Sequence, residues 1–68
     1  MGSQKKLGEN LKKLREMADL TQAEVAEGAA INTNFYARVE RGEEKVSLDT
    51  LEAIARVLKT KVSEIIPF

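Results

Sequence analysis

"LTQAEVAEGAAINTNFYARVERG", residues 20–42, holds the helix signals that decide the fold. Thr21 can cap a helix, and Glu24 three residues later completes a capping box, so a short helix is expected over residues 22–28. Asn32 repeats the start signal in front of a second apolar pattern. The stretch therefore predicts two short helices joined by a tight turn.

The segment before this stretch has a helical pattern of its own. Leu7, Leu11, Leu14 and Ala18 fall on one stripe of an amphipathic helix, which we expect over about residues 4–18. The charged residues of this segment fall off the stripe. The pattern predicts one long helix packed against the two short ones.

The segment after this stretch begins with a terminator and a third start signal. Gly42 is a natural left-handed end for the second short helix, and Ser47 can cap another helix that runs to about Lys59. A last turn should follow from Val62 to Ile66. The expected buried face of the fourth helix consists of Leu48, Leu51, Ile54, Ala55 and Leu58.

These patterns predict an all-α fold, a compact five-helix bundle without strand alternation or linker. The whole of 1–68 is expected to form a single domain, with residues 1–6 as a flexible start. Such a bundle serves many functions, so the fold class alone does not decide what the chain does.

Composition excludes several classes of protein. At 43% hydrophobic and 32% charged residues, the chain is too apolar for disorder and too interrupted for a membrane span. It contains no Cys and no His, which removes disulfides, thiol nucleophiles, imidazole bases and nearly all zinc chemistry. We therefore expect no enzyme, no metal and no cofactor. The first residues lack the apolar run of a signal peptide, so the expected compartment is the cytoplasm.

The formal net charge is zero, which argues mildly against a nucleic-acid binder. The charges are unevenly distributed, however, with five cations against three acids in residues 1–19. Only the face that meets phosphate has to be positive, so the average does not exclude DNA.

Two long segments resemble the phage repressor and Cro-type (XRE) family of helix-turn-helix regulators. They are "LGENLKKLREMADLTQAEVAEGAAINTNFYARVERG" and "SLDTLEAIARVLKTKVSEI", and the resemblance covers the chain from Leu7 to Ile66. "LR", "TQAEVA", "VERG" and "LEAIARVL" fall at the family's spacing. The resemblance implies a lambda-repressor-like fold, in which the second helix of the pair lies in the DNA major groove and the first crosses the backbone.

The resemblance also implies which side chains contact base edges: Asn32, Thr33, Asn34 and Arg38. An Asn amide can pair with adenine, an Arg guanidinium with guanine, and Thr with a thymine methyl or a phosphate. Asn32 is equally suited to cap the helix, because an amide that accepts from the helix start is not freely presented to a base. Both roles stay open for it.

Phe35 is expected to be an exposed ring. The second short helix already buries Tyr36 and Val39, which leaves Phe35 off the buried stripe. An exposed ring there would suit a thymine methyl or the wall of the groove. The alternative is that the ring packs on a neighbouring loop.

The resemblance assigns phosphate contact and bracing of the second helix to Gln22, and an internal ion pair to Arg15 and Glu40. The alternatives are an ordinary helix former and a weak surface pair. Further candidates for phosphate contact, each of which could equally be a solvated surface residue, are Arg41, Lys45, Lys12, Lys13 and Asn10.

The turn between the short helices departs from the family, which usually has Gly where this chain has Ala30. A left-handed Ala would cost about 1 kcal/mol. The alternative is a reshaped turn, in which Gly28 supplies the positive φ.

One short helix contacts only a few base pairs, so specific binding normally needs two copies about one DNA turn, roughly 34 Å, apart. We expect a homodimer with Ile65, Ile66 and Phe68 at the interface. Val62 and Ile65 could instead close the core of the monomer.

The favoured function is a transcriptional regulator that binds double-stranded DNA, namely a palindromic operator, as a homodimer. The alternative is a protein-interaction module, such as an antitoxin-like or co-regulator domain, that uses the second short helix or the apolar carboxyl end. Phage repressors, antitoxins and the controller proteins of restriction-modification systems all remain open. No membrane and no small-molecule ligand are expected.

Overall fold

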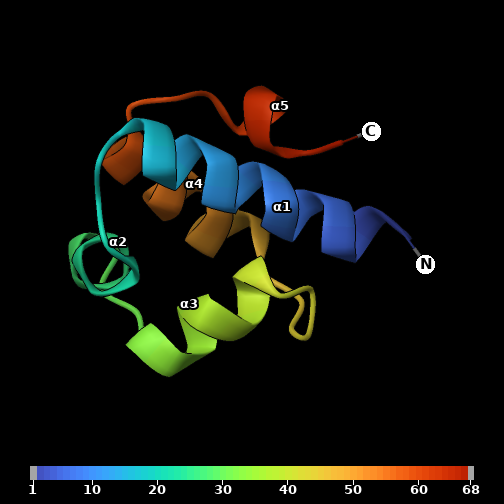
Figure 1. Ribbon diagram of the computed structural model, residues 1–68, viewed down its shortest axis with the longest axis horizontal. Coiled ribbons are helices and arrows are strands. Elements are labelled where there is room, and N and C mark those ends of the chain that lie inside the picture. Colours follow the sequence, from blue (N-terminus) through green and yellow to red (C-terminus); the bar gives the residue numbers. More distant parts are fainter. Residues whose placement is uncertain (1, 68) are drawn as a thin grey trace.

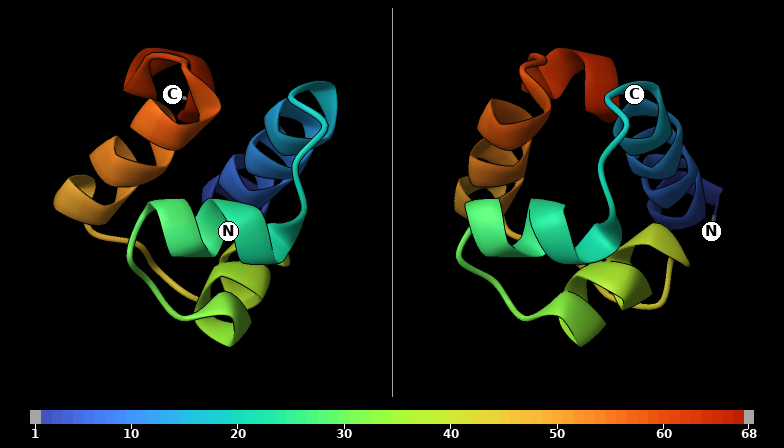
Figure 2. Two further views of the ribbon diagram at one scale, coloured as in Figure 1. Left: turned by 90° about the vertical axis from the view of Figure 1, so that its left-hand side faces the viewer. Right: turned by 60° about the vertical axis from the view of Figure 1, so that its left-hand side comes forward.

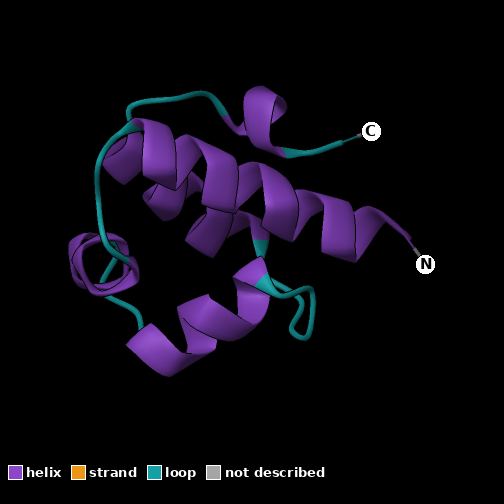
Figure 3. Cartoon of the chain, in the orientation of Figure 1, coloured by secondary structure: helices purple, strands orange, loops and turns teal. Residues whose placement is uncertain are grey.

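The computed structural model describes residues 2–67, which form five helices and no strand (Figures 1 and 3). The first helix, α1, includes most of the segment proposed as a flexible start. The helices match the predicted ones within about two residues. They are α1 Gly2–Met17, α2 Gln22–Gly28, α3 Thr33–Glu40, α4 Leu48–Leu58 and α5 Val62–Ile65.

The three predicted helix starts are confirmed by their hydrogen bonds. At α2, the Glu24 amide donates to Thr21 Oγ1 at 3.0 Å and the Thr21 amide donates to Glu24 Oε1 at 2.8 Å, which is a complete capping box. Asn32 and Ser47 accept from the amides three residues on, at 3.1 and 3.2 Å. Local sequence alone therefore sets where α2, α3 and α4 begin.

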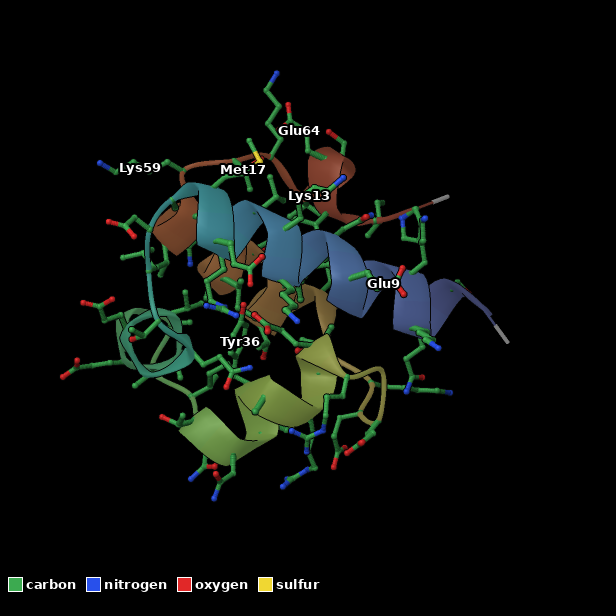
Figure 4. All side chains as sticks on the ribbon, in the orientation of Figure 1. Glu9, Lys13, Met17, Tyr36, Lys59 and Glu64 are labelled. Carbon is green, nitrogen blue, oxygen red and sulfur yellow. The ribbon has the colours of Figure 1, made fainter. Side chains whose placement is uncertain are left out.

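A single core lies at the centre of the bundle and receives side chains from all five helices. In Figure 2, α3 lies across the end of the bundle opposite α5, and Figure 4 shows Tyr36 in the space between α3 and α1. The largest fully buried side chains are Leu11, Val25, Tyr36, Val39, Ile54 and Ile65. The core thus fixes α3 at one edge of the molecule, with one face left outside.

Two residues of the predicted buried stripes lie outside the core. Leu48 is 62% exposed, because it is the first residue of α4 and the buried face begins one turn later at Leu51. Ala18 is exposed, because α1 ends at Met17 before the stripe is complete.

The turn between α2 and α3 is left-handed at Ala30, with a φ of 59°. Gly28 is the last residue of α2 and has no positive φ, so the reshaped turn is not formed. The Ile31 amide closes the turn by donating to the Ala26 carbonyl at 2.9 Å. Ala30 therefore occupies the position that favours glycine.

We expect Ala30→Gly to raise the free energy of unfolding by about 1 kcal/mol, because glycine adopts the left-handed conformation without steric cost. A chain of this size should then melt about 4–8 °C higher. Thermal unfolding followed by circular dichroism measures the change. The control is Ala23→Gly on the exposed face of α2. This variant should have a free energy of unfolding about 1 kcal/mol below that of the wild type. An Ala30→Gly variant no more stable than the wild type would mean that this turn is unstrained.

Candidate nucleic-acid interface

One side of α3 faces away from the core. Tyr36 and Val39 face the core. An α-helix has about 3.6 residues per turn, so Asn34 and the residues one and two turns after it lie on the opposite side. We call this set the α3 outer face. It consists of Thr33, Asn34, Ala37, Arg38 and Arg41, and it includes Ala37, which sequence reasoning missed.

The predicted contact residues do not all lie in the same way. Thr33 and Asn34 are exposed, and the Arg38 side chain is 41% exposed on the same side. Asn32 is exposed, but its Oδ1 accepts the cap hydrogen bond from the Phe35 amide, which restricts its orientation and leaves its amide nitrogen free for a second partner.

Phe35 is half-buried and packs against the core, so the prediction of an exposed ring is wrong. The residue lies at the edge between the buried and outward faces of α3, which a count along one helix does not resolve. Its ring supports the seating of α3 on the bundle.

Arg15, Glu40 and Gln22 tie the α2–α3 pair to α1. Arg15 donates from Nε to Glu40 Oε2 at 2.7 Å and from Nη2 to Oε1 at 3.2 Å, which is the predicted ion pair. Its Nη1 also donates to the Leu20 carbonyl at 2.9 Å, while Gln22 Nε2 donates to Glu40 Oε1 at 3.0 Å. Only 12% of the Arg15 side chain and 3% of the Glu40 side chain are exposed. Gln22 thus braces α3, as the resemblance implied.

The environment keeps the Arg15 guanidinium and the Glu40 carboxylate ionised. Burial pushes the pKa of Glu40 upward, but the hydrogen bonds from Arg15 and Gln22 outweigh it and hold that pKa below its usual range. The hydrogen bond to Glu40 raises the pKa of Arg15 further. Burial also raises the pKa of the Tyr36 hydroxyl, and the neighbouring Glu40 carboxylate raises it further. Glu40 is therefore an internal partner rather than a charge that repels phosphate.

A polar hollow of about 580 Å³ lies between α1, α2 and the end of α3. Three of the predicted phosphate contacts, Gln22, Arg41 and Lys12, line it together with Lys5. Lys5 was missed, although it precedes Lys12 by seven residues and so shares its side of α1. Glu9, Glu40 and Glu43 complete the lining.

The structure does not bring the other three phosphate candidates to this hollow. Asn10 Nδ2 donates to the Ile65 carbonyl at 2.8 Å and so joins α1 to α5. Lys13 lies on the α5 side of α1, away from α3 (Figure 4). Lys45 lines a separate groove.

Two exposed ion pairs join the end of α3 to the segment that follows it. Arg38 Nε lies 3.1 Å from Glu44 Oε2, and Arg41 Nε lies 3.0 Å from Glu43 Oε2. Hydrogen bonding to Arg41 lowers the pKa of Glu43. Sequence reasoning missed both pairs, because they depend on how the chain turns after α3.

The residues proposed for a dimer interface do not share one environment. Ile65 is fully buried within the monomer, so its assignment to an interface is wrong: it helps α5 to close the core. Ile66 is half-buried and lines an apolar groove of about 400 Å³, and Phe68 lies outside the described residues. The groove is lined by Ser3, Gln4, Leu7, Glu44, Lys45, Val46, Leu48, Leu51, Val62 and Ile66.

Within residues 2–67, no helix is long and apolar enough to cross a bilayer. The same residues contain no cluster of three or more acidic, His or Cys side chains placed to hold a metal ion.

Comparison with known proteins gives concordant matches. A family model described as helix-turn-helix matches residues 11–65. The immunity repressor of Bacillus phage phi105 is 38% identical over 88% of this chain, which spans only 42% of that repressor. The control protein C.SmaI of Serratia marcescens is 33% identical over 88% of this chain and 71% of its own length. The crystal structure of the restriction-modification controller protein C.AhdI from Aeromonas hydrophila superimposes with a TM-score of 0.89 at 29% identity, covering 91% of this chain and 94% of that one.

Proposed function

This chain belongs to the phage repressor/Cro-type (XRE) family of helix-turn-helix regulators, and we propose that it binds a palindromic DNA operator as a homodimer to regulate transcription. The relatives reported above are a repressor and control proteins, not enzymes. The observation that supports the proposal most is the α3 outer face, a polar surface with two arginines at one edge of the bundle, held in place by the contacts of Glu40 with Arg15 and Gln22. We propose the cytoplasm as the compartment of this protein, because bacterial and phage DNA lies there.

The side chains of the α3 outer face have the chemistry of base contact. Asn34 can donate to and accept from adenine, and Arg38 can donate two hydrogen bonds to guanine. Ala37 and the Thr33 methyl offer apolar contact to a thymine methyl. Asn32 can add a donor through the amide nitrogen that the cap leaves free.

The polar hollow beside α3 supplies the proposed contacts to the DNA backbone. Lys5, Lys12 and Arg41 are cations around it, and Gln22 adds an amide. Phosphate contacts position a protein on DNA without selecting sequence, so the hollow and the outer face divide the work between them. With about three to five phosphates neutralised per subunit, log affinity should fall with log salt at a slope of several units.

We propose a homodimer because α3, with eight residues, reaches only a few base pairs. The apolar groove with Ile66 in its lining and Leu48 at 62% exposure is the proposed contact surface, together with Phe68. Sedimentation at high micromolar concentration tests this part of the proposal, and a monomer there would reject it.

Selection from random double-stranded DNA tests the function as a whole. An enriched palindrome would establish DNA binding, two-fold symmetry and half-site spacing together. Failure to enrich any sequence, combined with an affinity that does not change with salt, would contradict the proposal.

A second candidate is a protein-interaction module, and the exposed Leu48 in the lining of the apolar groove is the observation that favours it. The half-buried position of Phe35 removes one argument for this reading. Capture of a specific protein in the absence of DNA, together with no selected DNA sequence, would favour the module.

We expect Arg38→Ala to relax the sequence preference at one base position of each half-site by about 1 to 3 kcal/mol. Binding to the selected operator and to single-base variants, measured by fluorescence anisotropy, gives this number. The matched control is Lys5→Ala, which should weaken binding to all sequences alike and reduce the salt slope by about one. A uniform loss with Arg38→Ala would assign Arg38 to phosphate instead.

A further inference from the structure

Two arginines of the α3 outer face, the proposed base contact Arg38 and the proposed phosphate contact Arg41, already have partners inside the protein. Glu44 holds Arg38 at 3.1 Å, and Glu43 holds Arg41 through two hydrogen bonds at 3.0 and 3.2 Å. We propose that these two acids, the acidic pair, are built-in competitors of DNA, which occupy the arginines until an operator displaces them. This inference rests on the proposed function and adds a control of affinity to it.

The acidic pair is held in position by the backbone. Gly42 has a φ of 78°, and this left-handed turn sends the chain back over the last turn of α3. The Glu43 amide donates to the Arg38 carbonyl at 2.9 Å, and Gln4 Nε2 from α1 donates to the Gly42 carbonyl at 2.9 Å. The acids therefore lie at fixed places beside the arginines.

Helix stability does not account for this arrangement. The carboxyl end of a helix favours cations, so acids directly after α3 are placed against the helix dipole. The side chains of the Arg38 pair are 41% and 39% exposed and those of the Arg41 pair 56% and 53%, and pairs as exposed as these contribute little to folding. We therefore expect the two ion pairs to act mainly on the binding of Arg38 and Arg41 to a ligand.

The acidic pair also bears on the choice between an operator and random DNA. In the free protein, two acids balance two arginines at the end of α3. An arginine that leaves its acid for a phosphate of arbitrary sequence exchanges one exposed ion pair for another and gains little. Arg38 gains more from a bidentate contact to a base, so its internal pairing with Glu44 favours the correct sequence over random DNA.

The expected effect is measured with Glu44→Gln, which keeps the shape of the side chain and removes its charge. Its affinity for the selected operator should rise about 2- to 5-fold at moderate salt. In an Arg38→Ala background the gain should vanish, because the competition needs the arginine. Glu52→Gln, at an exposed acid of α4 without an ion pair among residues 2–67, controls for the change in net charge.

Each outcome decides between explanations. An equal gain in both backgrounds would assign the effect to general charge repulsion, and weaker binding by Glu44→Gln, with an unchanged melting curve, would mean that Glu44 orients Arg38 for DNA. Either result overturns the competition. A wild-type chain that binds no DNA at all refutes the proposed function and the competition with it, whereas operator binding unaffected by Glu44→Gln refutes the competition alone.

Discussion

Arg15→Met should lower the free energy of unfolding by about 3 to 5 kcal/mol, the largest loss that we expect from one side chain. The substitution keeps most of the apolar stem but leaves Glu40, whose side chain is 3% exposed, without its cation. It also removes the donor to the Leu20 carbonyl, so the corner between α1 and α2 loses a hydrogen bond. A chain of 68 residues has only modest stability to lose.

Urea unfolding measures this loss, and two variants separate its causes. Arg15→Met combined with Glu40→Leu removes both charges and should recover most of the stability, because the cost comes from the unpaired buried charge. Arg41→Met breaks the exposed pair with Glu43 and should leave the unfolding curve unchanged. A single Arg15→Met variant with wild-type stability would show that solvent reaches Glu40 freely.

The same tie connects stability to the proposed DNA contact. Glu40 is the last residue of α3, and its carboxylate is held by Arg15 of α1 and Gln22 of α2. Three helices therefore meet at one buried carboxylate, and the angle at which α3 presents its outer face depends on it.

The order and ends of the helices could be predicted from the sequence, because their signals are local. The capping box of Thr21 and Glu24 and the left-handed Gly42 each act within a few residues. Ala30 was identified as unusual, but which residue of the turn is left-handed depends on α2 packing against α4. A Cβ on Gly28 would lie 2.9 Å from Val57 Cγ2.

Side chains at the edges of faces could not be predicted in this way. Phe35 and Leu48 each lie at the boundary of a helical stripe, where the crossing of neighbouring helices decides burial. Arg38 and Glu44 are six residues apart in sequence, and the turn after α3 brings them together. Helical spacing does not predict this pair. Among the proposed phosphate contacts, only assembly of α1 with α3 separates Lys12 from Lys13.

Gly8→Ala is expected to destabilise the protein by about 3 kcal/mol, although alanine is the better helix former by about 1 kcal/mol. Gly8 lies in the middle of α1, where the helix crosses the end of α3. A Cβ there would lie 2.5 Å from the Val39 carbonyl oxygen and 2.7 Å from the Glu40 carbonyl carbon. These are backbone atoms, which no change of rotamer can move aside.

Urea unfolding of Gly8→Ala beside Gly28→Ala tests whether backbone contact is the cause. Both glycines are helical, but the nearest atoms to the new Cβ at Gly28 belong to the Val57 side chain and not to the backbone, so its loss should be smaller. Equal effects of the two substitutions would reject the close approach of α1 to α3. Because the contact falls at Val39 and Glu40, relief of the clash has to move the end of α3 away from Arg15. Gly8→Ala should therefore also weaken DNA binding in the fraction that stays folded, although residue 8 contacts no DNA in the proposed complex.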